Sequence, residues 1–159
     1  INVVDDILAP SEVLRIKLTG AYPFKIVTMV PMMIRDVVKI TGVDIYERDV
    51  RWGFDADPRY FYGYWVGRRR EDRWTQSFFI IIVQGEQSSK DKIGWVTINL
   101  KGTVQTHYEY TNFIQKSFWW FYNIMFYWKQ RRQYIEYAKD NVYKMRDVMT
   151  RAMGVPREE

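Results

Sequence analysis

The sequence has no cysteine and a single histidine, His107, among its 159 residues. The absence of cysteine excludes disulfide bonds, thiol catalysis and cysteine-ligated zinc sites. A zinc site built on histidines is excluded as well, because His107 has no second histidine to join it. On the strand pattern around it, His107 shares a face with Gln105 and Glu109, which favours a surface position over a catalytic one.

The motifs of several enzyme classes are also missing. No phosphate-binding glycine loop, dinucleotide fingerprint or nucleophile elbow is present. Acidic pairs stand at Asp5-Asp6, Asp55/Asp57 and Glu71-Asp72, all in predicted loops. The second of these pairs lacks the glycine and the glutamate that an EF-hand requires. The sequence therefore assigns no catalytic residue, no metal ligand and no cofactor.

The composition is that of a globular protein. Hydrophobic residues make up 47% of the chain and charged residues 27%, which predicts one domain over residues 1–159 with a sizeable core. The formal net charge is +5 and the pI is about 9.3. This mildly basic balance allows weak contact with an anionic membrane surface or RNA without requiring it. With no cysteine and no secretory-type leader, we expect a cytoplasmic protein.

A stretch without glycine or proline, from Ser117 to Met153, predicts a long C-terminal helix. Asn112 or Ser117 suits its N-cap, and Gly154 suits its C-cap. A helix of about 35 residues would be about 50 Å long, more than the width of a small domain, so we expect a bend or a separate first helix near its start. One apolar face recurs at steps of three and four residues, namely Ile135, Ala138, Val142, Met145 and Met149.

Aromatic residues, 18% of the chain, are densest at the start of this helix. The run Phe118-Trp119-Trp120-Phe121-Tyr122 continues in Phe126-Tyr127-Trp128 and is too apolar on all sides for an ordinary surface helix. Three interpretations stay open: buried core, the wall and mouth of an apolar pocket, or a surface that docks on a membrane or a partner. Lys116, Ser117 and Asn123 interrupt the run, which is too short to span a bilayer.

Short elements precede the long helix. Residues from Tyr22 to Thr41 predict two helices, at 23–29 and 31–41, because Pro31 would break a longer one. Residues 1–10 show no clear element, and Gly102-Thr103 predicts a tight turn. Alternation of apolar and polar residues, or β-rich composition, predicts strands; these span 14–19, 43–52, 59–67, 74–84, 94–101 and 104–110.

This order of elements resembles the START-like, or helix-grip, superfamily. The resemblance extends from Ser11 to Gly154 and rests on the paired short helices around Pro31 and on the passage from strand to long helix at Thr106–Thr111. It implies an α+β fold in which a curved antiparallel sheet of about six or seven strands grips the C-terminal helix. It also implies a cavity between sheet and helix, which members of the superfamily commonly use to bind lipids and other apolar molecules.

Such a cavity makes non-enzymatic binding of an apolar small molecule or lipid the first functional hypothesis. In the strand at 59–67, Tyr60, Tyr62, Tyr64 and Val66 are predicted to share one face. The side chains expected to line the cavity are Tyr62, Tyr64, Val96, Ile98 and Tyr108 from the strands, and Ile124, Trp128, Ile135 and Ala138 from the helix.

Two other classes of function stay open. Arg68, Arg69, Arg70 and Arg73 lie at one predicted hairpin tip and suit phosphate contacts with nucleic acid, as in a ribosome-associated protein. Solubility and protection of a sheet edge explain the same arginines without a nucleic acid. The third class is an enzyme of the cyclase or dehydratase type known on the helix-grip fold, for which the sequence offers no acid–base pair. The sequence does not indicate an oligomeric state.

Overall fold

The computed structural model describes residues 2–9, 13–39, 45–53 and 57–153. These residues form six strands, three α-helices and one π-helical turn. In chain order they are β1 (Asn2–Asp6), β2 (Leu14–Ala21), α1 (Lys25–Asp36), β3 (Ile45–Trp52), β4 (Arg59–Arg70), β5 (Thr75–Gln87), β6 (Ile93–His107), α2 (Phe113–Tyr122), η2 (Asn123–Tyr127) and α3 (Trp128–Ala152).

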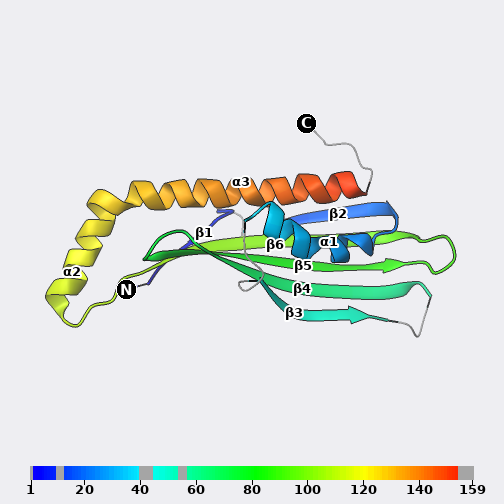
Figure 1. Cartoon of the computed structure of the whole chain (residues 1–159), viewed down its shortest axis with the longest axis horizontal. Helices are drawn as coiled ribbons and strands as arrows, with labels where there is room; N and C mark the ends of the chain where they lie inside the picture. The colour runs from blue at the N-terminus through cyan, green and yellow to red at the C-terminus, as the bar shows by residue number, and fades with distance from the viewer. Residues whose placement is uncertain (1, 10–12, 40–44, 54–56, 154–159) are drawn as a thin grey trace.

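The strands pair into an antiparallel sheet in the order β1-β6-β5-β4-β3, and β2 pairs with β6 beside β1. Both pairings fit on one strand because β6 is long. Its residues 93–100 pair with β2 and its residues 103–107 pair with β1. Helix α3 runs along one face of this sheet (Figure 1). The predicted α+β fold, a curved antiparallel sheet with a long C-terminal helix, is confirmed.

The predicted tight turn at Gly102-Thr103 is wrong, because β6 continues through it. Gly102 is needed for a close approach instead of a turn. A Cβ at this position would lie 2.6 Å from Ile7 Cδ1 and 2.8 Å from the Phe78 carbonyl oxygen. The expectation that residues 1–10 hold no element is also wrong, since β1 pairs with β6 just before Ile7. Five residues ending in two aspartates are too few to show an alternation.

The predicted break at Pro31 is absent, and Pro31 lies inside the continuous helix α1. Proline removes one backbone hydrogen bond from a helix interior. Packing outweighs that loss here, because α1 buries a full face against the sheet. The buried side chains of this face are Ile26, Val27, Val30, Met33 and Ile34. The end of the second predicted helix, at 40–41, lies outside the described residues.

The core lies on one face of the sheet, here called the inner face, beneath α1 and α3. Removal of these apolar side chains from water, at about 25 cal/mol per Å², is the main stabilising contribution. The side chains that fill it include Phe61, Trp65, Phe79, Ile81, Val83, Val96, Ile98 and Leu100 from the strands, and Ala138, Val142, Met145 and Met149 from α3. No helix of the described part of the chain covers the opposite, outer face.

The predicted face of β4 is reversed. Phe61 and Trp65 point to the inner face, whereas Tyr62 and Tyr64 point to the outer face and are half-buried there. Both faces of this strand carry large side chains, so alternation alone did not separate them. Gly63 decides the matter, because its missing side chain leaves the space that the indole of Trp65 occupies; a Cβ on Gly63 would lie 2.1 Å from that ring.

The expected bend near the start of the long helix is confirmed. Helix α2 stands at the end of the sheet, and the chain then turns through η2 into α3, which runs back over the inner face (Figure 1). Asn112 is the N-cap of α2, since its side-chain oxygen accepts a hydrogen bond from the Gln115 backbone N–H at 2.9 Å. The predicted C-cap, Gly154, lies outside the described residues.

Candidate functional site

The nine residues predicted to line a cavity do not come together. Val96, Ile98 and Ala138 are fully buried on the two sides of the inner-face core, and Ile135 packs beside them. Tyr62 and Tyr64 lie on the outer face of β4. Tyr108 is buried at the end of the sheet, away from the middle of α3, and Ile124 and Trp128 are exposed. The core side chains therefore fill the space between the sheet and α3.

An aromatic cluster holds α2 to the end of the sheet. Trp119 of α2 stacks on Tyr108, and Trp74 contacts Trp119 and Tyr122 edge-on, with ring centroids 5.7 and 5.9 Å apart. Tyr122 in turn stacks on Tyr127 at 6.0 Å. Trp119, Tyr122 and Tyr127 follow one another at intervals of three and five residues and form the anchored side of the segment. Aromatic pairs of this kind contribute about 0.5–1.5 kcal/mol each beyond their burial.

The π-helical turn η2 brings the hydroxyl of Tyr127 into the sheet. This hydroxyl lies 2.8 Å from Thr75 Oγ1 and donates to the carboxylate of Asp72. Tyr134 donates to the same carboxylate at 2.9 Å. The other oxygen of Asp72 accepts the backbone N–H groups of Trp74 and Thr75 at 2.8 and 3.0 Å. Four neutral donors thus occupy the Asp72 carboxylate.

Burial raises the pKa of both Tyr108 and Tyr127 above the ordinary range of a phenol. The hydrogen bond to Asp72 raises that of Tyr127 further, because ionisation would place two negative charges side by side. The pKa of Tyr134 is also raised, mainly by burial. These hydroxyls therefore act as permanent hydrogen-bond donors, and none is suited to be a base at neutral pH.

Arg131 of α3 is buried and ties the helix to the edge of the sheet. Its guanidinium donates to Thr106 Oγ1 and to the Asp5 carboxylate. Its neighbours Lys129 and Arg132 are exposed, so the three basic residues do not form one surface cluster.

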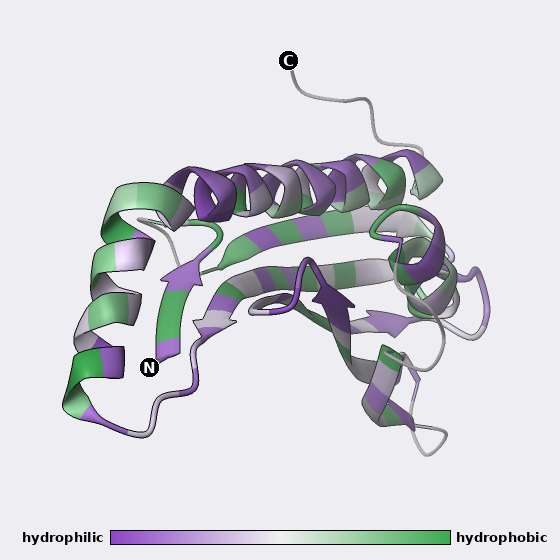
Figure 2. Cartoon of the chain, turned by 60° about the vertical axis from the view of Figure 1, so that its left-hand side comes forward, coloured by the Kyte–Doolittle hydropathy of each residue, from purple (hydrophilic) through white to green (hydrophobic). Residues whose placement is uncertain are grey.

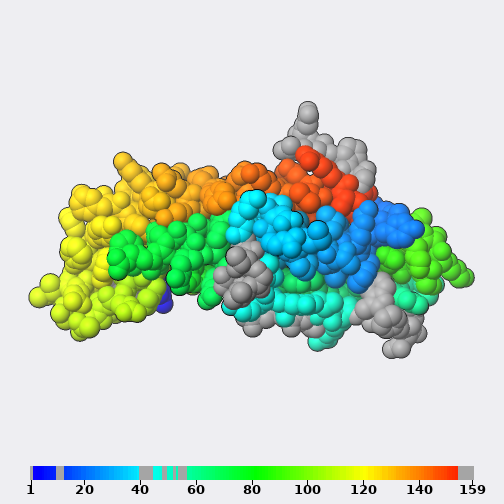
Figure 3. Space-filling view, in the orientation of Figure 1, coloured from blue at the N-terminus to red at the C-terminus, as the bar shows by residue number. Residues whose placement is uncertain are grey.

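The opposite side of α2 and η2 is uncovered in the described structure. No residue of α2 is buried, and Phe113 and Ile114 are 80% and 79% exposed. We call this surface the docking stripe; it comprises Phe113, Ile114, Trp120, Phe121, Ile124, Met125 and Trp128, at steps of four and seven residues. Phe118 and Phe126, also exposed, widen it. Figure 2 shows this mostly hydrophobic segment beyond the end of the sheet, and Figure 3 shows it at one end of the molecular surface.

Of the three interpretations of the aromatic run, buried core is wrong for most of its members. Only Tyr127 is fully buried, while Trp119 and Tyr122 are half-buried. A contiguous exposed apolar surface is uncommon on a soluble monomer.

Positive charge outweighs negative charge around the docking stripe, where Glu136 is the carboxylate that lies beside Lys129 and Arg132. From Tyr110 to Ile135 the chain contains no Asp or Glu. Lys116, Lys129 and Arg132 are exposed in the same segment. Lys129 and Arg132 line a shallow groove of about 600 Å³ together with Trp128, at the corner between η2 and α3.

The four arginines of the predicted hairpin tip do not form one patch, because neighbours along a strand point to opposite faces. Arg69 points to the inner face, where its Nε bonds to Glu71 at 2.7 Å and its Nη1 to the Val38 carbonyl at 2.8 Å. Its guanidinium also lies over the ring of Tyr137. Arg68, one residue earlier, is half-buried on the outer face.

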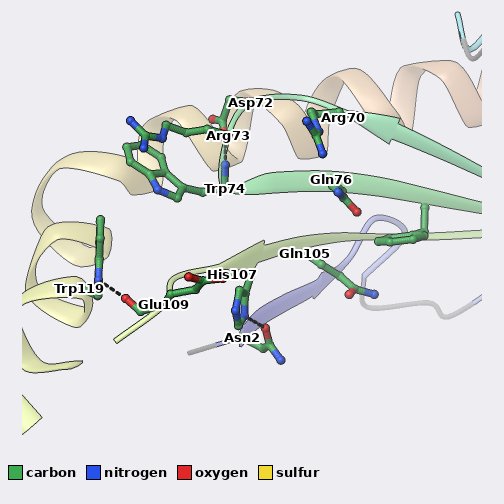
Figure 4. Close-up of a pocket in the computed structure, with 11 residues that line it drawn as sticks. Asn2, Arg70, Asp72, Arg73, Trp74, Gln76, Gln105, His107, Glu109 and Trp119 are labelled. Carbon is green, nitrogen blue, oxygen red and sulfur yellow. Dashed lines mark hydrogen bonds between the residues drawn. The ribbon is translucent and has the colours of Figure 1, made fainter. Parts of the chain in front are cut away.

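Arg70 and Arg73 both line a polar pocket of about 500 Å³ on the outer face beside α2. Figure 4 shows the side chains that surround it. They are Asn2, Arg70, Asp72, Arg73, Trp74, Gln76, Phe78, Gln105, His107, Glu109 and Trp119. Sequence reasoning placed His107 and Gln105 on one exposed face, which is confirmed. The pocket itself was not predicted, because it is built by residues from four strands, a hairpin and a helix.

The described part of the chain contains no group of three or more His, Asp or Glu side chains placed to hold a metal ion. Among its helices, none combines the length and the apolar character needed to cross a bilayer.

Comparison with known proteins gives no family. No protein-family model matches the sequence, and no curated protein matches it. Among solved structures, a protein of unknown function from Staphylococcus aureus aligns over 96% of this chain and 95% of its own, with 6% identity and a TM-score of 0.33. An uncharacterized protein from Rhizobium leguminosarum aligns over 91% and 97%, with 9% identity and a TM-score of 0.25. Ara h 8.0201 aligns over 77% and 96%, with 10% identity and a TM-score of 0.21. Scores this low carry no conclusion.

Proposed function

We propose that the protein docks on the surface of membranes that contain anionic lipids, through the docking stripe on α2 and η2. The observation that carries this proposal is the stripe itself. Its apolar side chains have the spacing of a helix face that is normally covered, yet the described residues leave them exposed. Helix α2 and η2, residues 113–127, together form what we call the arm. The opposite side of the arm packs against the end of the sheet.

The length of the arm favours a position in the membrane interface. Helix α2 has ten residues and η2 five, so together they reach about 22 Å at 1.5 Å per residue, less than the roughly 30 Å of a bilayer core. Apolar helices of this length lie in the plane of the interface, with aromatic rings at the level of the headgroups.

The charge of the arm favours an anionic membrane over a second copy of this protein as the partner of the docking stripe. Two copies of this protein that met through their stripes would bring Lys116, Lys129 and Arg132 of one copy close to the same cations of the other, and Glu136 would offset this repulsion only in part. An anionic membrane instead attracts each exposed cation by about 1 kcal/mol. Both parts of the surface, apolar and cationic, therefore suit an anionic bilayer.

The test is co-flotation with vesicles of phosphatidylcholine, with and without phosphatidylserine. The protein is expected to float with the anionic vesicles and much less with the neutral ones. The double substitution Phe121→Ser and Ile124→Ser should abolish flotation. Met32→Ser with Ile93→Ser is the matched control, because these two side chains are similarly exposed, at 57% and 54%, but lie elsewhere. Binding that survives loss of the stripe, or no binding to either vesicle, would overturn the proposal.

A second candidate is the binding of an apolar small molecule between the sheet and α3, as the resemblance to the START-like superfamily implies. The arrangement of α3 along the inner face supports it. Val96, Ile98 and Ala138 fill that space at 0% exposure, so a ligand would have to displace packed side chains. Native mass spectrometry of freshly purified protein tests this candidate, because a co-purified apolar molecule would be detected directly.

A further inference from the structure

The polar pocket beside α2 is separate from the docking stripe, and its lining suggests a ligand of its own. We infer that it binds a phosphate group, carried by a small phosphate ester or by a lipid headgroup. The pocket of about 500 Å³ brings two guanidinium groups, Arg70 and Arg73, together with uncharged hydrogen-bond donors.

The sheet register fixes one wall of the pocket. Arg70 of β4 pairs with Gln76 of β5, and Gln76 pairs with Gln105 of β6. Directly paired residues point to the same face with Cβ atoms about 5 Å apart. The three side chains thus form a row of donors across three strands on the outer face, which no helix of the described residues covers. Figure 4 shows the two glutamines facing the same space as Arg70.

His107 lies two residues beyond Gln105 along β6, on the same face of the sheet. Its Nδ1 is hydrogen-bonded to the side-chain oxygen of Asn2, directly across on β1. Because an amide oxygen only accepts, Nδ1 carries the proton of this bond. The ring is therefore fixed in orientation at the pocket wall.

The charges of the pocket decide which ligand it suits. The Asp72 carboxylate also lines the pocket, but it forms no ion pair with Arg70 or Arg73 among the described residues; its oxygens accept from Tyr127, Tyr134 and two backbone N–H groups. Neither Arg70 nor Arg73 forms an ion pair with another described residue, and the guanidinium of Arg73 lies 5.2 Å from the ring centre of Trp74. Arginine side chains in such an arrangement suit phosphate oxygens, which accept two parallel hydrogen bonds.

Two further features of the pocket lining affect which phosphate compounds it suits. Trp74 and Trp119 give the pocket an aromatic side, against which the organic part of an ester can pack. Glu109 also lines the pocket, and its backbone carbonyl accepts the indole N–H of Trp119 at 2.9 Å. Its carboxylate opposes any phosphate anion, so the packing of an organic group on the aromatic side is what favours a phosphate ester over free inorganic phosphate.

The experiment measures binding of glycerol-3-phosphate and inorganic phosphate by calorimetry, and binding to vesicles that contain phosphatidic acid. The ester is expected to bind more tightly than inorganic phosphate. Arg70→Gln with Arg73→Gln should weaken ester binding by at least about tenfold, as the loss of one charge-assisted hydrogen bond already implies. Arg15→Gln with Lys17→Gln removes the same charge elsewhere on the outer face and should change little. Glu109→Gln should tighten the binding of inorganic phosphate.

The two sources of phosphate are distinguished by the two arms. Binding of soluble ester assigns the pocket to small phosphorylated molecules. Binding only to phosphatidic acid vesicles, with loss in the Arg70/Arg73 variant but not in the Arg15/Lys17 control, assigns it to a headgroup. The docking variant Phe121→Ser/Ile124→Ser should keep ester binding, so failure of docking is separable from failure of this site. Equal affinity of the pocket variant and the wild type, or no phosphate binding in either arm, would overturn the inference.

Discussion

Tyr108 and Trp119 stack face to face, with ring centroids 4.6 Å apart and ring planes 7° from parallel. Tyr108 directly follows β6, and Trp119 is at the middle of α2, so this pair joins the end of the sheet to the arm. The indole N–H of Trp119 also donates to the Glu109 carbonyl at 2.9 Å. Because α2 buries no residue of its own, the position of the docking stripe depends on this contact.

Trp119→Ala should release the arm while the rest of the fold stays intact. The variant loses the stack on Tyr108, the edge contact with Trp74 and the hydrogen bond to Glu109. Hydrogen exchange of the α2 amides should become faster, while the protection of β5 and β6 should stay. Trp120→Ala is the control, since Trp120 is an exposed neighbour outside the cluster. Equal exchange in the two variants would show that Trp119 does not anchor the arm.

Tyr127→Phe should destabilise the protein without changing its shape. The substitution removes only the hydroxyl that bonds to Thr75 and Asp72, and it leaves both partners short of a hydrogen bond in a buried place. The expected loss is about 1–3 kcal/mol in the free energy of unfolding, measured by chemical denaturation. Tyr137→Phe, at a side chain that is 44% exposed, should cost far less. Similar losses for the two would mean that the hydroxyl of Tyr127 is not held as described.

Alkaline pH should unfold the protein through the same tyrosines. The folded state raises the pKa of Tyr108, Tyr127 and Tyr134, whereas the unfolded chain ionises them near pH 10. Stability is therefore fully present below about pH 10 and falls as the pH rises further. The melting temperature should drop above that pH, and the drop should be shallower in Tyr127→Phe. A melting temperature that stays constant up to pH 11 in the wild type would contradict this.

The order of the elements could be predicted from the sequence because periodicity reports burial. Ala138, Val142 and Met145 recur at helical steps and do face the sheet. The alternation along β2 likewise gave the right strand, whereas in β6 it gave two strands, 94–101 and 104–110, where the structure has one. Periodicity failed where both sides of an element are apolar. In β4, the face was set by the space that Gly63 leaves for Trp65, a contact between side chains that no pattern contains.

The candidate site was harder to predict, for a different reason. The aromatic run showed that α2 has apolar surface, but only the fold decides whether something covers it. Trp119 and Tyr122 contact Trp74, and Trp119 stacks on Tyr108, whereas Phe121 contacts Phe126, which is itself exposed. The polar pocket depends on the register that places Arg70, Gln76 and Gln105 side by side on β4, β5 and β6. These residues are not adjacent in the sequence, so no local pattern shows that they meet.

Ala138→Asp should unfold the protein, whereas Arg132→Ala should not. Ala138 is fully buried between α3 and the sheet, and a carboxylate there would be desolvated in a closely packed core, which costs several kcal/mol. Arg132 lies on the exposed side of the same helix. Circular dichroism melting distinguishes the two variants. Equal melting temperatures would mean that the inner face of α3 is wrongly assigned.

Added salt should drive the two uses of the docking stripe in opposite directions. Docking on anionic vesicles depends on attraction to Lys116, Lys129 and Arg132, and salt screens this attraction over a Debye length of about 10 Å at 0.1 M. Vesicle binding should therefore weaken as salt is raised. Self-association through the stripe is opposed by the same three cations, so screening should promote it, and light scattering in the absence of lipid should rise. The Phe121→Ser/Ile124→Ser variant should show neither effect, because it lacks the apolar contact that both require. If association without lipid instead weakened with salt, the cations would be attracting the partner copy, and the stripe would be an interface between copies of this chain.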